Sequence, residues 1–361
     1  MEAAYSMPFV CYSCQGQGPT TVPQNYYFAN HNGYNASNYP PPPPPPAAYG
    51  CRTYNQCSYP QPLQLMTPPP PPPLTPPSSF GNKRAVIIGI SYGHQTNSIK
   101  GSLNDAQCVK NFLISKAFPT DSMWILTDHP GERNPMRIPT RYNIRMAMRW
   151  LVEGCRSGDS LWFYYSGHGS QEEDTDMDEL DGYDEAICPV DYVHEGKIID
   201  DEINATIVRP LPHGAKLHAL VDTCFSGTIL DLPFMCRMNR KGHYGWQDHR
   251  NRRTYKGTRG GLAVCISACD DDGSAADTSA FSGVESTGAL TFSFIQAMQN
   301  QSNLTYGNLL NSMRSTIRGA KERTFGPTDR QFSMNTRLQY VHEPQLSSSE
   351  MFEIYSKTIV I

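Results

Sequence analysis

The most constraining feature of this sequence is the uneven distribution of proline and charge along its 361 residues. Residues 1–82 contain 20 of the 30 prolines, including the runs Pro40–Pro46 and Pro68–Pro73, but only two charged residues. A segment with so little aliphatic content cannot bury enough apolar surface to offset the entropy that it loses on ordering. We therefore predict a disordered Pro-rich arm over residues 1–82, followed by a folded region long enough for one large core or two small ones.

From residue 83 onward, short apolar runs alternate with segments of helical periodicity. The predicted strands span residues 84–91, 122–126, 159–166, 216–223 and 261–268, and the predicted helices span residues 102–118, 140–155, 288–300 and 305–320. Continuous apolar strands with helices between them are typical of a mainly parallel sheet covered on both faces. The sequence thus predicts an α/β fold with a mainly parallel central sheet flanked by helices. Ser102 and Asp105 stand at the spacing of a capping box for the first helix.

Bulk composition excludes several classes of function. The formal net charge is −4 and the pI is about 6.2, so nucleic-acid binding has no electrostatic support. No apolar run approaches the ~18 residues that span a bilayer, and no secretory signal is recognisable, so no membrane partner is expected. The 11 cysteines are odd in number and scattered, which indicates reduced thiols. We expect a cytoplasmic protein, with a nuclear location as the alternative.

The arm carries two features that suggest partners. Polyproline runs favour an extended conformation that binds aromatic grooves, so we expect partners that recognise Pro-rich motifs. The arm also contains four cysteines, Cys11, Cys14, Cys51 and Cys57. A compact zinc site needs a close second pair, whereas Cys51 and Cys57 are separated by five residues. Zinc is therefore an alternative that the spacing does not favour.

Two predicted strands end in reactive side chains. One continues into YSGHG at 165–169 and the other into DTCFSG at 222–227. The carboxyl ends of parallel strands lie at one edge of a sheet, so His168 and Cys224 should meet there. A thiolate can attack a carbonyl while the imidazole exchanges its proton, and Gly169 lets a backbone amide approach the oxyanion. Taken singly, each residue could instead be a buried thiol or a hydrogen-bonded histidine.

These two motifs resemble the active-site motifs of caspase-like cysteine proteases, and of metacaspases in particular. Asp222-Thr223 stands where caspases carry Gln-Ala, and the Pro-rich arm is similar to that of plant type I metacaspases. The resemblance implies a caspase–haemoglobinase fold and a Cys224–His168 dyad, with the oxyanion held by the amides of Gly169 and Cys224. It further implies endopeptidase activity after Arg or Lys in protein or peptide substrates, and a role in programmed cell death or stress responses.

The preference for a basic residue can also be argued from carboxylates near the dyad. Alternate residues of a strand share a face, so Asp222 lies on the face of Cys224 and Ser166 on that of His168. Two carboxylates beside the scissile position would attract a cationic side chain and repel an acidic one. The resemblance assigns the specificity pocket to Asp105, Ser166 and Asp222. The alternatives are helix capping by Asp105 and a hydrogen bond from a neighbouring loop to Asp222.

An acidic stretch follows the third predicted strand, with nine acids in residues 172–185. An EF-hand is not expected, because Glu179 occupies the position that needs Gly, and a solvated acidic loop is the simplest interpretation. The resemblance, however, implies an activating Ca²⁺ bound by scattered carboxylates. Their counterparts in this sequence are Asp184, Asp200, Asp201 and Asp231. Oxygen ligands from several loops suit Ca²⁺.

Residues 237–259 contain eight basic residues and one acid, between two parts of the predicted domain. We interpret them as a basic processing linker that joins a large-subunit-like region (83–236) to a small-subunit-like region (260–361). A calcium-stimulated protease that selects Arg or Lys can cut its own linker, so we predict a self-processing zymogen. The candidate sites are Arg237, Arg240, Lys241, Arg250, Arg252, Arg253, Lys256 and Arg259. The alternatives are a catalytically idle scaffold and a zinc-binding adaptor that acts through the arm.

Overall fold

The computed structural model describes most of the chain beyond the Pro-rich arm. The described residues are 81–93, 98–99, 101–175, 177, 179, 182–224, 226–238, 243–250, 254–268, 277–278, 287–300, 303–324 and 344–361. The arm predicted over 1–82 and the four cysteines considered for zinc lie outside these ranges, except for Gly81 and Asn82.

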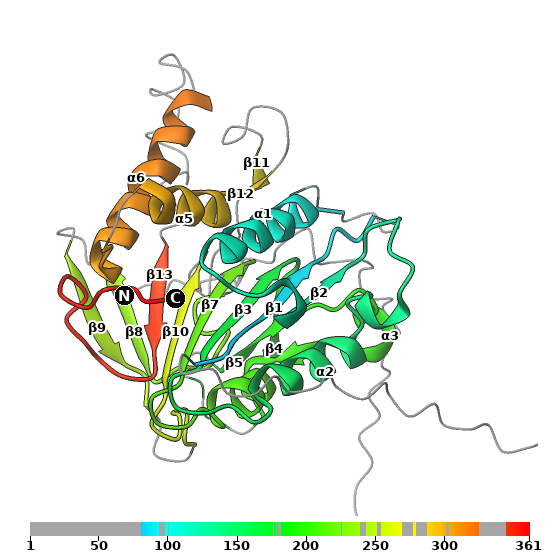
Figure 1. Ribbon diagram of the computed structural model, residues 1–361, viewed down its shortest axis with the longest axis horizontal. Coiled ribbons are helices and arrows are strands. Elements are labelled where there is room, and N and C mark those ends of the chain that lie inside the picture. Colours follow the sequence, from blue (N-terminus) through cyan, green and yellow to red (C-terminus); the bar gives the residue numbers. More distant parts are fainter. Residues whose placement is uncertain are drawn as a thin grey trace, which may run out of the picture. The chain divides into compact units, whose positions relative to one another are not determined.

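The core of the fold is an eight-stranded sheet in the order β2-β1-β3-β7-β10-β13-β8-β9 (Figure 1). Its strands are β1 (Lys83–Gly89), β2 (Met123–Thr127), β3 (Ser160–Ser166), β7 (Lys216–Asp222), β8 (Phe234–Met238), β9 (Tyr244–Asp248), β10 (Leu262–Ser267) and β13 (Gln345–Ser348). The five strands from β2 to β10 pair in parallel, whereas β13, β8 and β9 pair antiparallel. The prediction of a mainly parallel central sheet is confirmed.

Burial on both faces explains why these strands read as unbroken apolar runs. In β1, Val86 and Ile88 enter one buried cluster, whereas Ala85 and Ile87 enter another on the opposite face. The first cluster is closed by α2 (Arg141–Val152). The second is closed by α1 (Ser102–Ser115), α5 (Ala289–Asn300) and α6 (Tyr306–Thr324), which lie on the other side of the sheet in Figure 1.

The helix cap predicted from the sequence is present at the start of α2 but absent at the start of α1. Thr140 Oγ1 accepts a hydrogen bond from the Asn143 amide at 3.2 Å, which satisfies one exposed donor at the start of α2. The capping-box prediction for α1 is wrong, because its N-cap is Gly101 and makes no side-chain cap bond. The Asp105 carboxylate is buried and accepts its bond from another part of the chain. Asp105 is therefore available to the site described below.

Sequence reasoning missed a second, three-stranded sheet that follows β3. It consists of β4 (Gly169–Glu173), β5 (Tyr183–Ile187) and β6 (Ile198–Ile199). Helices α3 (Tyr192–Glu195) and α4 (Asp200–Ile203) adjoin it, and a short π-helical turn, Asn204–Val208, follows α4. A small two-stranded ladder joins β11 (Asp277–Thr278) to β12 (Thr287–Gly288). No helix in the described part of the chain is long and apolar enough to cross a membrane.

The predicted linker is more structured than its composition suggested. Arg237 lies in β8 and the segment Tyr244–Asp248 forms β9, so the two strands make a hairpin at one edge of the large sheet. Trp246 Nε1 donates to the Phe352 carbonyl at 2.8 Å, which fixes β9 to the end of the chain. Trp246, an aromatic residue within a basic segment, is the feature of the sequence that could have indicated this strand.

Candidate active site

The registry of two neighbouring strands brings the predicted dyad together. β3 and β7 pair in parallel, with Ser166 opposite Asp222, and His168 and Cys224 each follow two positions later. Beyond the sheet the two backbones approach closely, since a Cβ built on Gly169 would lie 2.1 Å from the Cys224 carbonyl oxygen. Only glycine fits this contact. The structure thus places His168, Gly169 and Cys224 at one point on the carboxyl edge of the sheet.

His168 is held on both sides of its backbone. Its amide donates to the Tyr92 hydroxyl at 3.0 Å, and its carbonyl accepts from the Tyr165 hydroxyl at 2.7 Å and from the Cys188 amide at 3.1 Å. The Tyr92 ring lies against the imidazole, with ring centroids 4.5 Å apart and an interplanar angle of 33°. His168 is only 5% exposed. Sequence reasoning did not identify Tyr92, because nothing in the sequence links it to a residue 76 positions away.

Cys224 differs from the inert thiols of the core. Among the described cysteines, Cys188, Cys236 and Cys265 are buried, whereas Cys108, Cys155 and Cys224 are partly exposed, and of these three only Cys224 follows the carboxyl end of a parallel strand next to that of His168. Burial raises the pKa of Cys236 and of Cys265 to about 12, so both remain protonated at neutral pH. Exposure at a sheet edge beside a histidine is the setting in which a thiol acts as a nucleophile.

The three residues predicted for the specificity pocket gather beside the dyad. Asp105, Ser166 and Asp222 are 1%, 4% and 6% exposed. A Cβ built on Gly288 would lie 2.1 Å from Asp222 Oδ2 and 3.1 Å from Asp105 Oδ2, so both carboxylates converge on that glycine. Burial, with a smaller contribution from the negative charges of Asp105 and Asp222, raises the pKa of the nearby Tyr164 hydroxyl well above its usual value. Asp105 and Asp222 therefore place two carboxylates together in a buried part of the fold.

Both carboxylates also have partners within the chain. The Gly288 amide donates to Asp105 Oδ2 at 2.8 Å. The amide and hydroxyl of Thr291 donate to Asp222 Oδ2 at 3.0 and 2.8 Å, at the start of α5. The hydrogen-bond partner of Asp222 is therefore the first turn of α5 rather than a loop, and its role in a specificity pocket stays a prediction. Gly288 and Thr291 could not be found from sequence, because their partner is far away in the chain.

Several carboxylates predicted for calcium lie in what we call the acidic cluster. Its residues are Glu179, Asp184, Glu185, Asp200 and Asp231. Burial, followed by repulsion from the other four carboxylates, raises the pKa of Asp200 well above its usual value. Asp201 is only partly buried, and its amide donates to Asp200 Oδ1 at 2.9 Å. The stretch 172–185 is therefore more than a solvated loop, since Asp184 and Glu185 point into the protein.

The acidic cluster contains a cation from the chain itself. Lys256 Nζ lies 2.5 Å from Asp231 Oδ1 and 2.6 Å from Glu179 Oε1, and the Lys256 side chain is 3% exposed. Burial alone would lower the pKa of Lys256, but the two carboxylates outweigh it and raise that pKa. Within the described ranges, no group of three or more His, Cys, Asp or Glu side chains is arranged to hold a metal ion. In this structure the acidic cluster coordinates an ammonium group.

The predicted processing sites have different surroundings. Arg250 and Arg259 are exposed, and Arg250 pairs with Asp248 at 2.6 Å. Arg237 is part of β8. The expectation that Lys256 lies in an accessible linker is not met, because its side chain is buried in the acidic cluster. The other four sites, Arg240, Lys241, Arg252 and Arg253, lie outside the described residues.

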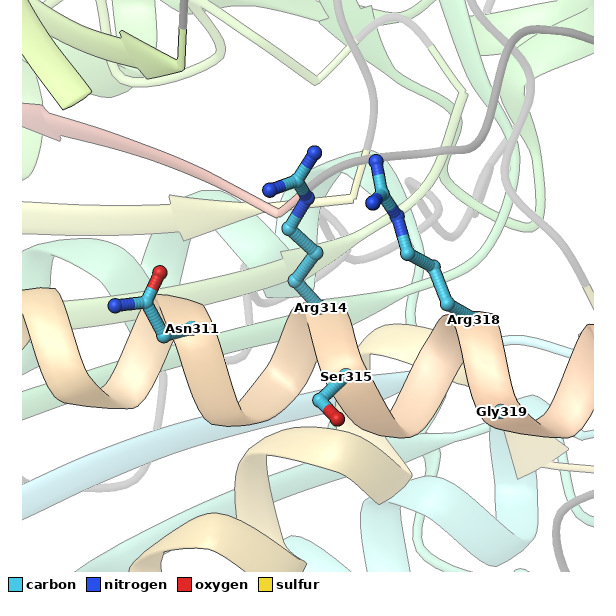
Figure 2. Close-up of a pocket in the computed structure, with 5 residues that line it drawn as sticks. All are labelled: Asn311, Arg314, Ser315, Arg318 and Gly319. Carbon is cyan, nitrogen blue, oxygen red and sulfur yellow. The ribbon is translucent and has the colours of Figure 1, made fainter. Parts of the chain in front are cut away.

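A hollow on α6 is separate from these residues. Figure 2 shows that Arg314 and Arg318 extend from the same side of the helix, with Asn311, Ser315 and Gly319 completing the lining. None of the residues predicted for catalysis, specificity or calcium binding lines it.

Known proteins are similar to this sequence over most of its length. A family model described as the metacaspase, peptidase C14 domain matches residues 83–233. Metacaspase-1 of Arabidopsis thaliana is 51% identical over 299 residues, which cover 79% of this chain and 80% of that protein. Metacaspase-3 of the same species is 53% identical over 287 residues, covering 79% and 77%. Metacaspase-1 of Mycosarcoma maydis is 35% identical over 312 residues, covering 76% and 72%.

Proposed function

From the premise that this chain belongs to the metacaspase family and is a cysteine-type peptidase, we propose that it cleaves proteins after Arg or Lys, with Cys224 as nucleophile. Family membership agrees with the caspase–haemoglobinase fold that the motifs imply. The observation that carries the proposal is the convergence of His168, Cys224 and two buried carboxylates on one edge of the sheet.

The chemistry follows from the placement of the two reactive groups. Cys224 Sγ attacks the substrate carbonyl carbon, and His168 takes up the thiol proton and then gives it to the leaving amine as the C–N bond breaks. Water attacks the resulting thioester and gives a proton to His168; the C–S bond then breaks, and His168 returns that proton to the departing sulfur to restore the thiol. The amides of Gly169 and Cys224 stabilise the oxyanion in both steps. The close approach of Gly169 to the Cys224 backbone supports this pair of donors.

Selectivity for Arg or Lys is supported by the charge of the pocket. Asp105 and Asp222 are buried together near Gly288, so a basic side chain would be drawn to them and an acidic one repelled. The test is hydrolysis of two peptides that differ only in having Arg or Asp before the scissile bond. Equal cleavage of both peptides would contradict the proposed selectivity.

We further propose that Ca²⁺ stimulates the enzyme through the acidic cluster. The donor set fits this ion, because the cluster supplies hard carboxylate oxygens that outnumber the single ammonium of Lys256. A bound Ca²⁺ would supply the positive charge that Asp200 lacks among its four neighbours. Activity and heat of binding, each measured against Ca²⁺ concentration after chelation, test this part of the proposal.

The remaining proposals concern activation and biological role. We propose a zymogen that cuts its own 237–259 linker, supported by the exposure of Arg250 and Arg259. We propose a cytoplasmic enzyme of programmed cell death or stress responses, whose Pro-rich arm binds partners. Fluorescent tagging tests the location. The role is tested by comparing the survival of cells that carry the wild-type chain with that of cells that carry Cys224→Ala. The proposed role requires that survival differs between the two.

A further inference from the structure

Tyr92 has a backbone conformation that tyrosine rarely adopts. Its φ of 52° lies in the left-handed region, and its side chain is 1% exposed. The carboxylate of Asp128, just beyond β2, holds this turn: Oδ1 accepts from the Ser91 amide and Oδ2 from the Tyr92 amide, each at 2.7 Å. Such strain persists only where surrounding contacts enforce it, and it often marks a functional position.

The enforced turn directs Tyr92 against the catalytic histidine. Its hydroxyl accepts from the His168 amide at 3.0 Å and donates to the Cys188 carbonyl at 2.5 Å. Because Tyr165 holds the His168 carbonyl, the histidine backbone is fixed at both its donor and its acceptor. The remaining freedom of His168 is rotation of its side chain, and the Tyr92 ring, 4.5 Å away, restricts that rotation.

We propose that Tyr92, held in its strained turn by Asp128, is a positioning residue that keeps the His168 imidazole aligned with Cys224. The inference rests on the proposed dyad. A small misplacement of a reacting group costs as much as about 100-fold in rate, which sets the scale of the expected effect. Substrate contacts are unchanged by such a misplacement, so kcat should fall while KM stays constant.

Three variants test this role in the full chain with Ca²⁺. Tyr92→Leu removes ring and hydroxyl and should lower kcat about 100-fold, with KM within about twofold of wild type. Tyr92→Phe keeps the ring and should recover most of that loss. Asp128→Asn weakens the turn and should lower kcat about tenfold, which provides a second test if Tyr92→Leu does not fold. The rate of Cys224 alkylation by iodoacetamide should follow the same order.

The chain offers a matched control in another buried tyrosine–histidine pair. The Tyr306 hydroxyl lies 2.7 Å from His218 Nε2, and the two ring centroids are 6.2 Å apart in a stacked arrangement. His218 lies near the amino end of β7, whereas the dyad lies beyond the carboxyl ends of β3 and β7. Tyr306→Phe should therefore lower the unfolding midpoint without changing kcat. Wild-type kcat in folded Tyr92→Leu, or an equal fall in Tyr306→Phe, would overturn the inference. Activity that survives Cys224→Ala would instead overturn the dyad itself.

Lys256 supports a second, independent inference about the calcium response. Its ammonium contacts Asp231 and Glu179, and its carbonyl accepts from Asn204 Nδ2 at 3.1 Å. The ammonium lies against two carboxylates of the acidic cluster and supplies positive charge to them. A Ca²⁺ on these carboxylate oxygens would lie close to the ammonium, and repulsion between the two positive charges in a buried site would favour departure of the ammonium.

We infer that Lys256 is a built-in counter-ion that Ca²⁺ displaces, and that its displacement exposes the bond after Lys256 to cleavage. The inference rests on the proposed calcium response. If the displaced state is a tenth or less of the population without Ca²⁺, the apparent Kd is weakened about tenfold or more. A variant that lacks the Lys256 ammonium should bind Ca²⁺ without competition from that charge.

The experiment uses the Cys224→Ala chain, which cannot cut itself. Lys256→Met should tighten the calorimetric Kd for Ca²⁺ about tenfold or more. Lys197→Met removes the charge of a lysine that pairs with Glu172 in β4, outside the acidic cluster, and should change the Kd little. In the chain that retains Lys256, saturating Ca²⁺ should accelerate added trypsin at the Lys256–Gly257 bond, as measured by mass spectrometry.

The possible outcomes distinguish a failure of the displacement inference from a failure of the calcium proposal. A Kd unchanged or weakened by Lys256→Met, or a Lys256–Gly257 bond that stays protected with saturating Ca²⁺, would overturn the displacement inference alone. Absence of any heat of binding in the parent chain would overturn the calcium proposal and this inference with it.

Discussion

Asp222 allows the sharpest test of how this enzyme selects its substrates. Asp222→Asn removes the charge but keeps an oxygen that can accept from the amide and hydroxyl of Thr291, so α5 should still begin correctly. Because the carboxylate is only 6% exposed, its attraction for a basic substrate is little screened by water. Loss of one partner from such a desolvated pair costs about 2–5 kcal/mol. The kcat/KM for an Arg peptide should therefore fall about 30-fold to about 5,000-fold.

The assay compares peptides that end in Arg or in citrulline, which has nearly the same shape without the charge. Wild type should favour Arg strongly, whereas Asp222→Asn should cleave both peptides at similar rates. Thr291→Val is the matched control, because it removes one hydrogen bond to Asp222 but leaves the charge in place. An Arg-to-citrulline ratio that Asp222→Asn leaves at the wild-type value would refute the electrostatic argument.

Four further predictions follow from the site. Cys224→Ala should abolish peptide hydrolysis with an unchanged thermal unfolding midpoint, because only the nucleophile is lost. Gly169→Ala should lower kcat/KM about 100-fold or more, since its Cβ would meet the Cys224 carbonyl oxygen at 2.1 Å; a fully active variant would contradict that contact. Neutralising Asp200 and Asp201 together should remove calcium stimulation, and stimulation that persists would exclude them. Calcium should produce new termini within 237–259 in wild type but not in Cys224→Ala, as mass spectrometry can establish.

The sequence predicted the five parallel strands because buried strands leave a strong local signal, but it did not predict the antiparallel strands β13, β8 and β9. The five parallel strands were found from unbroken apolar runs, and the alternation of Val86 and Ile88 with Ala85 and Ile87 shows the cause. The three-stranded sheet was missed because its strand β4 is polar and partly exposed, which gives no apolar run.

The site was only partly predictable, for a different reason. His168 and Cys224 could be placed together because strand ends are local properties and both strands were expected in one parallel sheet, whose carboxyl ends share an edge. The partners that shape their surroundings, Tyr92 and Thr291, contact residues that lie far from them in the chain. The burial of Lys256 could not be predicted either. A basic residue in a basic segment is expected to be exposed, and the carboxylates that pair with Lys256 lie far from it in the chain.

The strand order has a consequence for what self-cleavage would create. β8 lies between β13 and β9, and β13 lies between β10 and β8. A cut on either side of β9 leaves strands of the two fragments interleaved through backbone hydrogen bonds, rather than facing each other across a surface. Dilution could not separate such fragments. Exchange with fragments of another molecule would require rupture of the sheet. Each activated enzyme would therefore keep both halves of its own precursor for its whole lifetime.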